Sequence, residues 1–195
     1  MCRIDFSQFI ASFGVLSSCE VNAVLAAFDV KIYEKNTLLL SIGDISTQLI
    51  FVEYGLVQEF STLAQEDTMI TRWFISEGNF HHVVHSFLDH LPSASGIEVL
   101  EKAKIWSIKK QDLEALYDSY PSLHILSKLM MERVLKKYES YIAVLRKPAE
   151  ERLEWFYRNQ PQLANRIPQK YVASYLNITP THLSRIRRKL TSQSK

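Results

Sequence analysis

The 195-residue sequence predicts an α+β protein with a β-rich region followed by an all-helical second half. Between residues 30 and 108, runs of β-branched and aromatic residues are separated by turn-forming residues at intervals of roughly 8–12 residues. From Gln111 onward, the apolar residues recur at helical spacing instead. The charged residues are also unevenly distributed along the chain, because every acidic residue lies at or before Glu154. Together these patterns indicate a β domain followed by helical domains.

Composition limits the functional classes. Apolar residues make up 47% of the chain, enough for the core of one large domain or two small ones. No run approaches the roughly 20 apolar residues of a membrane helix, and the opening MCRIDFSQFIASFG lacks the apolar segment of a signal peptide. We therefore expect a cytoplasmic protein with no membrane partner. Cys2 and Cys19 are too few for a disulfide framework, so free thiols are expected.

The first elements follow from local patterns. Residues 5–28 are expected to be helical, because Val21, Val24, Leu25 and Phe28 recur at helical spacing. Three β-rich runs come next: VKIYEKNTLLLSIGD, TQLIFVEYGLVQEFSTL and DTMITRWFISEGNF. The turn signals that interrupt them are Asn36, Gly43-Asp44, Tyr54-Gly55, Glu66-Asp67 and Gly78. HHVVHSFLDHL predicts a short helix. Two later runs, Gly96–Leu100 and Lys104–Ile108, predict further strands. Short strands at this spacing are typical of an antiparallel sandwich or barrel.

A long helix follows the β region. QDLEALYDSYP predicts a short helix that stops before Pro121, and SLHILSKLMMERVLKKYESYIAVLRK then runs 26 residues without Gly or Pro. One apolar stripe, Leu123, Leu126 and Met130, is expected to pack on the β domain. A second stripe has the heptad spacing 3, 4, 3, 4 and consists of Met131, Val134, Tyr138, Tyr141 and Leu145. The second stripe favours a homodimer, with burial of both stripes inside one chain as the alternative.

The residues after this helix predict a basic helical domain. Pro148 is expected at the first position of the helix PAEERLEWFYRNQP, with Glu150 and Glu151 in the first turn. The predicted domains are therefore 1–120, the dimerisation helix 121–147, and 148–195. From Trp155 to Lys195 there are eight basic residues and no acidic one, so this segment carries +8 and the rest carries 2 − 8 = −6. A basic end on an acidic body favours nucleic-acid binding, although a solvated tail has the same charge.

Residues 169–190, QKYVASYLNITPTHLSRIRRKL, have the pattern of two helices joined by a tight turn. Asn177 tolerates the left-handed conformation of such a turn, Thr179 is expected as N-cap, and Pro180 begins the second helix. The residues expected in the core are Val172, Ala173, Leu176, Ile178, Leu183, Ile186 and Leu190. Thr181, Arg185 and Arg188 fall on another face of the second helix. The combination predicts a helix-turn-helix that binds double-stranded DNA.

These motifs resemble the Crp/Fnr superfamily of bacterial transcription regulators over nearly the whole chain. The resemblance rests on IGDISTQLIFVEYGLV and FISEGNF, on the long helix, and on VASYLNITPTHLSRIRRKL. The variant PQKYVASYL with ITP…LSRIR is similar to a subgroup common in Bacteroidetes. The resemblance implies a cyclic-nucleotide-binding-like antiparallel β jelly roll with flanking helices, a dimerisation helix and a small all-α helix-turn-helix domain. It implies a homodimeric, DNA-binding regulator, with RNA polymerase as a further candidate partner.

The sequence departs from the family where a cyclic nucleotide would bind. The family uses a Gly-Glu pair and, later, an Arg followed by Ser or Thr, whereas here Asn79 follows Gly78 and Pro92–Ser95 contains no Arg. A bound phosphate needs a bidentate cation or a nest of backbone donors. We therefore expect an unidentified small-molecule effector other than cyclic AMP, or an unliganded scaffold, and no cofactor is identified. The candidate effector-pocket residues are Gly78, Asn79, Phe80, Ser93, Ala94 and Ser95.

The recognition helix also departs from the family. It begins Pro180-Thr181 in place of the family's Arg-Glu and keeps only Arg185, which is expected to contact a guanine edge. The remaining basic residues are expected to contact phosphates. The candidate DNA-binding residues are Gln169, Lys170, Thr179, Pro180, Thr181, His182, Ser184, Arg185, Arg187, Arg188 and Lys189. The family's β-hairpin wing is not evident after Leu190.

Two other functional classes compete with DNA binding. His81, His82, His85 and His90 lie within ten residues, and helical spacing of the first three could chelate a divalent metal, as in a cupin-like enzyme. The histidines do not alternate along a strand as a cupin site requires. No nucleophile elbow, Walker loop or HExxH motif occurs, so no catalytic residue and no metal site are assigned. The other alternative is a sensor domain that binds protein partners through its C-terminal helices.

Overall fold

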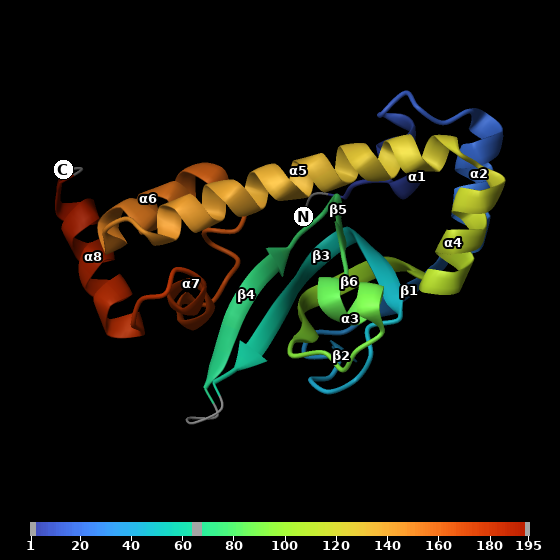
Figure 1. Ribbon diagram of the computed structural model, residues 1–195. Helices are drawn as coiled ribbons and strands as arrows, with labels where there is room; N and C mark the ends of the chain where they lie inside the picture. Colours follow the sequence, from blue (N-terminus) through green and yellow to red (C-terminus); the bar gives the residue numbers. More distant parts are fainter. Residues whose placement is uncertain (1–2, 64–67, 194–195) are drawn as a thin grey trace. The chain divides into compact units, whose positions relative to one another are not determined.

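The computed structural model describes residues 3–63 and 68–193, with side chains from 190 onward left out. The chain divides into two compact units, Met1–Met130 and Met131–Lys195 (Figure 1). The boundary lies within α5 (Ser122–Leu145), so this helix contributes to both units. No helix among the described residues is both long enough and apolar enough to cross a lipid bilayer.

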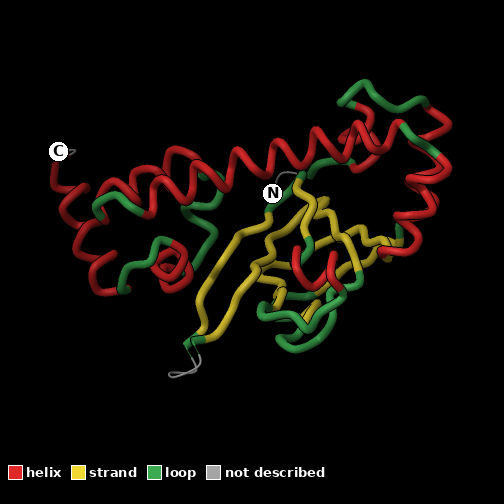
Figure 2. The backbone as a smooth tube through the Cα atoms, viewed as in Figure 1, coloured by secondary structure: helices red, strands yellow, loops and turns green. Residues whose placement is uncertain are grey.

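The first unit is built on an antiparallel sheet, which confirms the predicted fold class. Its described strands are β1 (Asp29–Tyr33), β2 (Leu38–Leu40), β3 (Gln48–Thr62), β4 (Met69–Ile75), β5 (Asn79–His81) and β6 (Gly96–Lys109). The strand order is β1-β6-β3-β4, and β2 also pairs with β6 while β5 pairs with β3. Figure 2 shows β3 and β4 side by side as a long hairpin. The positive φ angles of Asn36, Gly43 and Gly78 confirm turns at those residues.

Two strands are longer than the sequence predicts. The turn expected at Tyr54-Gly55 is wrong, because β3 continues through it, and the runs Gly96–Leu100 and Lys104–Ile108 form the single strand β6. The β3–β6 register shifts around residues 52–57, so the strands bend at bulges instead of reversing. Gly55 permits this bend, because it has φ +102° and a Cβ there would lie 2.6 Å from Ala103 Cα. The turn expected at Glu66-Asp67 lies outside the described residues.

Helices cover one face of this sheet. The predicted helix 5–28 is in fact two helices, α1 (Phe6–Ala11) and α2 (Ser18–Ala27), with Gly14 between them at φ +65°. α1, α2 and α4 (Lys110–Ser119) lie together with the start of α5 (Figure 1). Phe6, Phe51 and Leu126 belong to the core that these helices bury against the sheet. The predicted short helix is α3 (Val84–Asp89).

The second unit is helical in its described part. After α5 it contains α6 (Ala149–Asn159), α7 (Gln169–Tyr175) and α8 (Pro180–Gln193). Pro148 is the N-cap of α6 and not its first helical residue, so that prediction was one position off. Leu153 and Phe156 of α6 are fully buried in the core. Tyr141 of α5 stacks on Tyr175 of α7 with ring centroids 4.5 Å apart, and its hydroxyl donates to the Tyr175 carbonyl over 2.7 Å.

Candidate nucleic-acid interface and effector site

The segment from α7 to α8 has the local geometry of a helix-turn-helix. Asn177 adopts the left-handed conformation with φ +52°. The Ile178 amide donates to the Ala173 carbonyl over 3.0 Å, which closes the end of α7. At the start of α8, the Thr179 hydroxyl accepts a hydrogen bond from the His182 amide over 3.2 Å, as expected of an N-cap.

Small and apolar residues hold the two helices together. Ala173 is completely buried where α7 meets α8, and Val172 and Leu176 flank it in the core. Leu183 and Ile186 are the buried residues of α8. Leu190, expected in the same stripe, has a side chain outside the described part of the structure. The apolar pattern of the sequence therefore positions α8 with a defined face toward solvent.

The exposed face of α8 carries three of the predicted DNA-binding side chains. Thr181, Arg185 and Arg188 are exposed and lie on the side of the helix away from Leu183 and Ile186. Gln169, Lys170, Thr179, Pro180 and Lys189 are also exposed, whereas His182, Ser184 and Arg187 are half-buried. Lys170 Nζ lies 4.7 Å from the Tyr171 ring centroid, and Lys189 Nζ lies 3.7 Å from a Glu150 oxygen.

A residue that sequence reasoning missed holds the turn in place. Arg152 of α6 donates through Nη1 to the carbonyls of Leu176, over 2.7 Å, and Asn177, over 3.0 Å. These carbonyls follow the last turn of α7 and have no partner within the helix. Arg152 is adjacent to the fully buried Leu153, so it lies at the edge of the apolar face of α6. This position beside the apolar face was the sequence signal that could have distinguished Arg152 from arginines that only contact solvent.

The predicted dimerisation stripe lies only partly on the exposed face of α5. Met131 and Tyr138 are 57% and 36% exposed, and Val134 is 38% exposed. Tyr141 instead packs on Tyr175, and Leu145 is half-buried. Leu135 and Ile142, which the prediction left out, are 59% and 53% exposed. Met131, Leu135, Tyr138 and Ile142 thus form an exposed apolar stripe with heptad spacing 4, 3, 4, and Val134 is exposed beside it.

Three of the six candidate effector-pocket residues build a turn and the core. Gly78 has φ +74° and forms the turn before β5. The Asn79 side chain donates to the carbonyls of Ser76, over 3.0 Å, and Glu77, over 3.1 Å, which stabilises the same turn. Phe80 packs against Phe51 with ring centroids 5.0 Å apart. All three residues therefore have structural roles within the first unit.

The other three candidates, Ser93, Ala94 and Ser95, form a loop with internal hydrogen bonds and with backbone hydrogen bonds to Gly43 and Asp44. The Ser93 hydroxyl donates to the Ser95 carbonyl over 2.6 Å and accepts from the Ser95 amide over 3.1 Å. The Ser93 amide and carbonyl bond to the backbone of Asp44 and Gly43, each over 2.8 Å. Ala94 is exposed. The Ser95 side chain also hydrogen-bonds to the carboxylate of Glu59.

Glu59 is the centre of a buried charge cluster that the sequence did not predict. Its side chain is 8% exposed, and its oxygens lie 3.3 Å from Arg72 Nε and 3.0 Å from His81 Nε2. The contact of His81 Nε2 with Glu59 is short but does not have the geometry of a hydrogen bond. Burial alone would raise the pKa of Glu59, but the contacts with His81, Ser95 and Arg72 outweigh burial and hold the pKa below its usual value.

The four histidines that are close in sequence have different surroundings in the structure. His82 lies against Phe87 with ring centroids 4.5 Å apart, and burial together with the neighbouring His81 lowers its pKa to about 4. His85 pairs with Asp89 over 3.5 Å on α3, and His90 ends that helix in a left-handed conformation. Among the described residues, no three His, Cys, Asp or Glu side chains are placed to hold a metal ion. Cys19 is a free, exposed thiol, and Cys2 lies outside the described residues.

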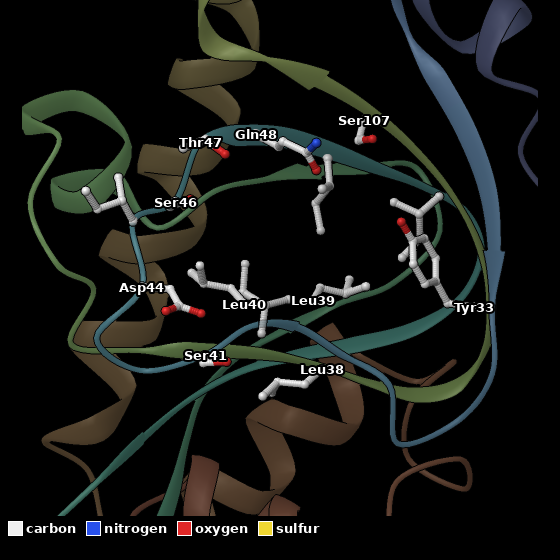
Figure 3. Close-up of a pocket in the computed structure, with 14 residues that line it drawn as sticks. Tyr33, Leu38, Leu39, Leu40, Ser41, Asp44, Ser46, Thr47, Gln48 and Ser107 are labelled. Carbon is white, nitrogen blue, oxygen red and sulfur yellow. The ribbon is translucent and has the colours of Figure 1, made fainter.

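A cavity of about 440 Å³ opens in the first unit between β1, β2, β3 and β6 (Figure 3). Its apolar wall comes from Leu38–Leu40, Ile45, Ile50, Ile97 and Ile105. Its polar lining residues are Tyr33, Ser41, Asp44, Ser46, Thr47, Gln48 and Ser107. Asp44 is the one charged side chain in this lining, and none of the six candidate effector-pocket residues belongs to it.

Comparisons with known proteins agree with this architecture. Residues 30–120 match the family model of the cyclic nucleotide-binding domain. FixK2 from Bradyrhizobium japonicum is 17% identical over 86% of each chain, with a TM-score of 0.74. CLP, described as a c-di-GMP-responsive global regulator of Xanthomonas campestris, is 13% identical over 91% of this chain and 93% of its own, with a TM-score of 0.73. A CooA mutant from Carboxydothermus hydrogenoformans is 18% identical over 87% of this chain and 79% of its own, with a TM-score of 0.69.

At these identities the likeness to solved structures is one of fold. No curated protein matches the chain by sequence. The matched residues 30–120 contain β1 to β6 and α4, and the structural likeness extends into the helical second unit. Residues 30–120 thus match the cyclic nucleotide-binding domain family, and the chain shares the fold of FixK2, CLP and the CooA mutant.

Proposed function

We propose that the protein is a DNA-binding transcription regulator of the Crp/Fnr type. The observation that carries this proposal is the α7–turn–α8 segment, with its left-handed Asn177, its Thr179 cap and its exposed Thr181, Arg185 and Arg188. A helix of this kind fits the B-DNA major groove, which is about 12 Å wide. The eight basic and no acidic residues after Glu154 favour contact with the phosphate backbone.

The exposed residues of α8 differ in their expected roles. Arg185 is central on the face away from the core, so we assign it to a base edge, where a guanidinium can bond to guanine O6 and N7. Arg188, Lys189 and Lys170 lie at the margins and are assigned to phosphates. Arg187 and His182 are half-buried, and their contacts to DNA are expected at the edge of the interface.

The active form is proposed to be a homodimer through α5. Met131, Leu135, Tyr138 and Ile142 leave an apolar stripe exposed, and apolar side chains at heptad spacing pair between two helices. Two DNA-binding units related by a two-fold axis read a palindrome whose half-sites are about 34 Å apart.

Cyclic AMP is not the proposed effector. The segment Ser93–Ser95 has no basic side chain and hydrogen-bonds to the buried carboxylate of Glu59. A phosphate next to that ionised carboxylate would meet a like charge, while Arg72 is already paired with Glu59. The first unit is therefore proposed either to bind a ligand of different charge or to act as a scaffold.

Selection from random DNA followed by titration tests the proposal. A selected palindrome should bind the protein with an affinity that falls steeply as salt rises from 50 to about 200 mM. Arg185→Ala should weaken binding about 10-fold or more and relax preference at one base pair, whereas Arg188→Ala should weaken all sequences alike. Lys31→Ala, which removes an exposed charge from β1, is the matched control and should bind normally. Absence of salt-dependent binding to any selected DNA would refute the assignment.

A further inference from the structure

The cavity lined by Ile50, Ile97 and Ile105 has the composition of a small-molecule site. Its volume of about 440 Å³ falls within the range of roughly 300–1,000 Å³ that is usual for ligand pockets. Figure 3 shows Gln48 and Ser107 on one side, Leu38–Leu40 on the opposite side, and Tyr33 and Asp44 toward the two ends. Seven of the fourteen lining residues are apolar and seven are polar, so the cavity suits a molecule with both apolar and hydrogen-bonding parts.

Several polar groups of this lining have no hydrogen-bond partner among the residues that the structure describes. Ser107 is 8% exposed, and Tyr33 and Ser41 are half-buried. Within the described residues, none of their hydroxyl groups takes part in a hydrogen bond, and neither does the Gln48 amide. Half-buried polar groups of this kind gain free energy when a ligand supplies the missing hydrogen bond. The hydroxyl groups of Tyr33, Ser41 and Ser107 therefore mark positions at which a ligand could form hydrogen bonds.

Charge limits the class of ligand. No Lys, Arg or His is among the lining residues, and the one charged lining group is the Asp44 carboxylate. Lys31, two residues before Tyr33 on β1, is exposed and outside the lining. An anion needs charge-assisted donors, so this cavity disfavours phosphates and carboxylates. A neutral or positively charged group meets no such penalty there.

We propose that this cavity binds a small amphipathic molecule whose polar groups are uncharged or cationic. The role of this cavity as the effector site of a regulator rests on the proposed function. Its ability to bind a small molecule does not depend on that function. The chemistry is opposite to that of a cyclic nucleotide, whose phosphate is an anion. Neither Gly78–Phe80 nor Ser93–Ser95 lines this cavity, although the Ser93 amide donates to the carbonyl of the lining residue Asp44.

Three probes of one shape and different charge test the proposal: 2-naphthamide, 2-naphthamidine and 2-naphthoate. Each is titrated into the full chain without DNA, and the isoleucine methyl resonances are followed by NMR. The amide and the amidine should shift the methyl signals of Ile50, Ile97 and Ile105 and leave Ile10 and Ile108, buried in the other core cluster, unchanged. The naphthoate should bind at least about 10-fold more weakly.

Variants locate the site and identify the charge preference. Ser107→Leu places a larger side chain in the cavity and should abolish the shifts, and Val30→Ala, exposed on β1 outside the lining, should not. Asp44→Asn should reduce any advantage of the amidine over the amide, roughly 3-fold for an exposed carboxylate, without loss of amide binding. Equal or tighter naphthoate binding, or shifts that persist in a folded Ser107→Leu protein, would overturn the proposal. Because DNA is absent, a failure of DNA binding does not affect the result.

Discussion

The guanidinium of Arg152 donates a hydrogen bond of 2.7 Å to the carbonyl of Leu176 and so joins α6 to the end of α7. The same Nη1 also bonds to the Asn177 carbonyl over 3.0 Å. The connection fixes the backbone just before α8 begins at Pro180. A base-reading helix needs a defined orientation, so Arg152 is a positioning residue for the proposed DNA contact although it need not touch DNA itself.

Arg152→Met should therefore weaken DNA binding and stability together. It removes hydrogen bonds from a charged donor, each worth about 1.5–3 kcal/mol, and part of that free energy returns when water bonds to the carbonyls. We expect a loss of about 1–2 kcal/mol in the free energy of unfolding, measured with urea. Arg158→Met, which removes an exposed arginine from the same helix, should leave stability within about 0.5 kcal/mol. Equal effects of the two substitutions would contradict the role of Arg152.

His82 should make stability depend on pH. Its folded-state pKa is about 4, below the ordinary value of 6.5, so between these values the unfolded chain binds more protons and stability falls as pH falls. The loss across this window should reach at most about 3 kcal/mol. The charged neighbours that bear on His82 are His81, which disfavours its protonation, and Glu59, which favours it.

His82→Leu should flatten the pH profile between pH 6.5 and 4, measured by chemical unfolding at a series of pH values. Below about pH 4.5 both proteins should lose stability, because the lowered pKa of Glu59 means that its contribution is present above the unfolded-state pKa and disappears as the carboxylate is protonated. An unchanged slope above pH 5 in His82→Leu would rule out His82 as the cause.

Gly55→Ala should destabilise the first unit through a steric clash. Its φ of +102° disfavours a side chain, and a Cβ would lie 2.6 Å from the Ala103 backbone. We expect a loss of about 2–4 kcal/mol in the free energy of unfolding. Gly43→Ala is the matched control, since Gly43 has φ +92° with open space around it and retains only the backbone strain, about 1–2 kcal/mol. A difference below about 0.5 kcal/mol between the two would argue against the clash.

Substitutions on α5 can distinguish the predicted stripe from the exposed one. Leu135→Glu should shift a dimer toward monomer at micromolar concentration, because it places a charge in an apolar interface. Lys136→Glu changes the adjacent exposed position outside the stripe and should keep the dimer. Sedimentation velocity measures both. A wild-type monomer at all concentrations, or a dimer unaffected by Leu135→Glu, would exclude pairing through this stripe.

Features with local causes were predictable. Asn177, Thr179 and Pro180 define the turn through their own backbone and capping preferences, and the structure has each in its expected place. The heptad spacing on α5 was also visible in the sequence. However, Met131 and Tyr138 fit two heptad stripes, one that continues through Val134 and Tyr141 and one that continues through Leu135 and Ile142. The packing of Tyr141 on Tyr175 removes one member of the predicted stripe from the exposed face, and heptad spacing alone does not indicate a contact between residues 34 positions apart.

Features with distant causes were not predictable. The bend in β3 depends on how closely Gly55 approaches Ala103, so a local turn signal gave the wrong answer there. Glu59, Arg72 and His81 lie on three different strands, and nothing in their spacing indicates that they meet. The cavity has the same character, because its lining comes from four strands and the segment between β2 and β3.

The exposed stripe on α5 also has a consequence for how much protein a cell must make. If the stripe is what holds two chains together, the fraction of dimer follows mass action and rises with the total concentration of the chain. Promoter occupancy would then depend more steeply than linearly on expression level whenever the monomer predominates. Each apolar contact along Met131, Leu135, Tyr138 and Ile142 would set the threshold at which a gradual change in synthesis becomes a sharp change in transcription.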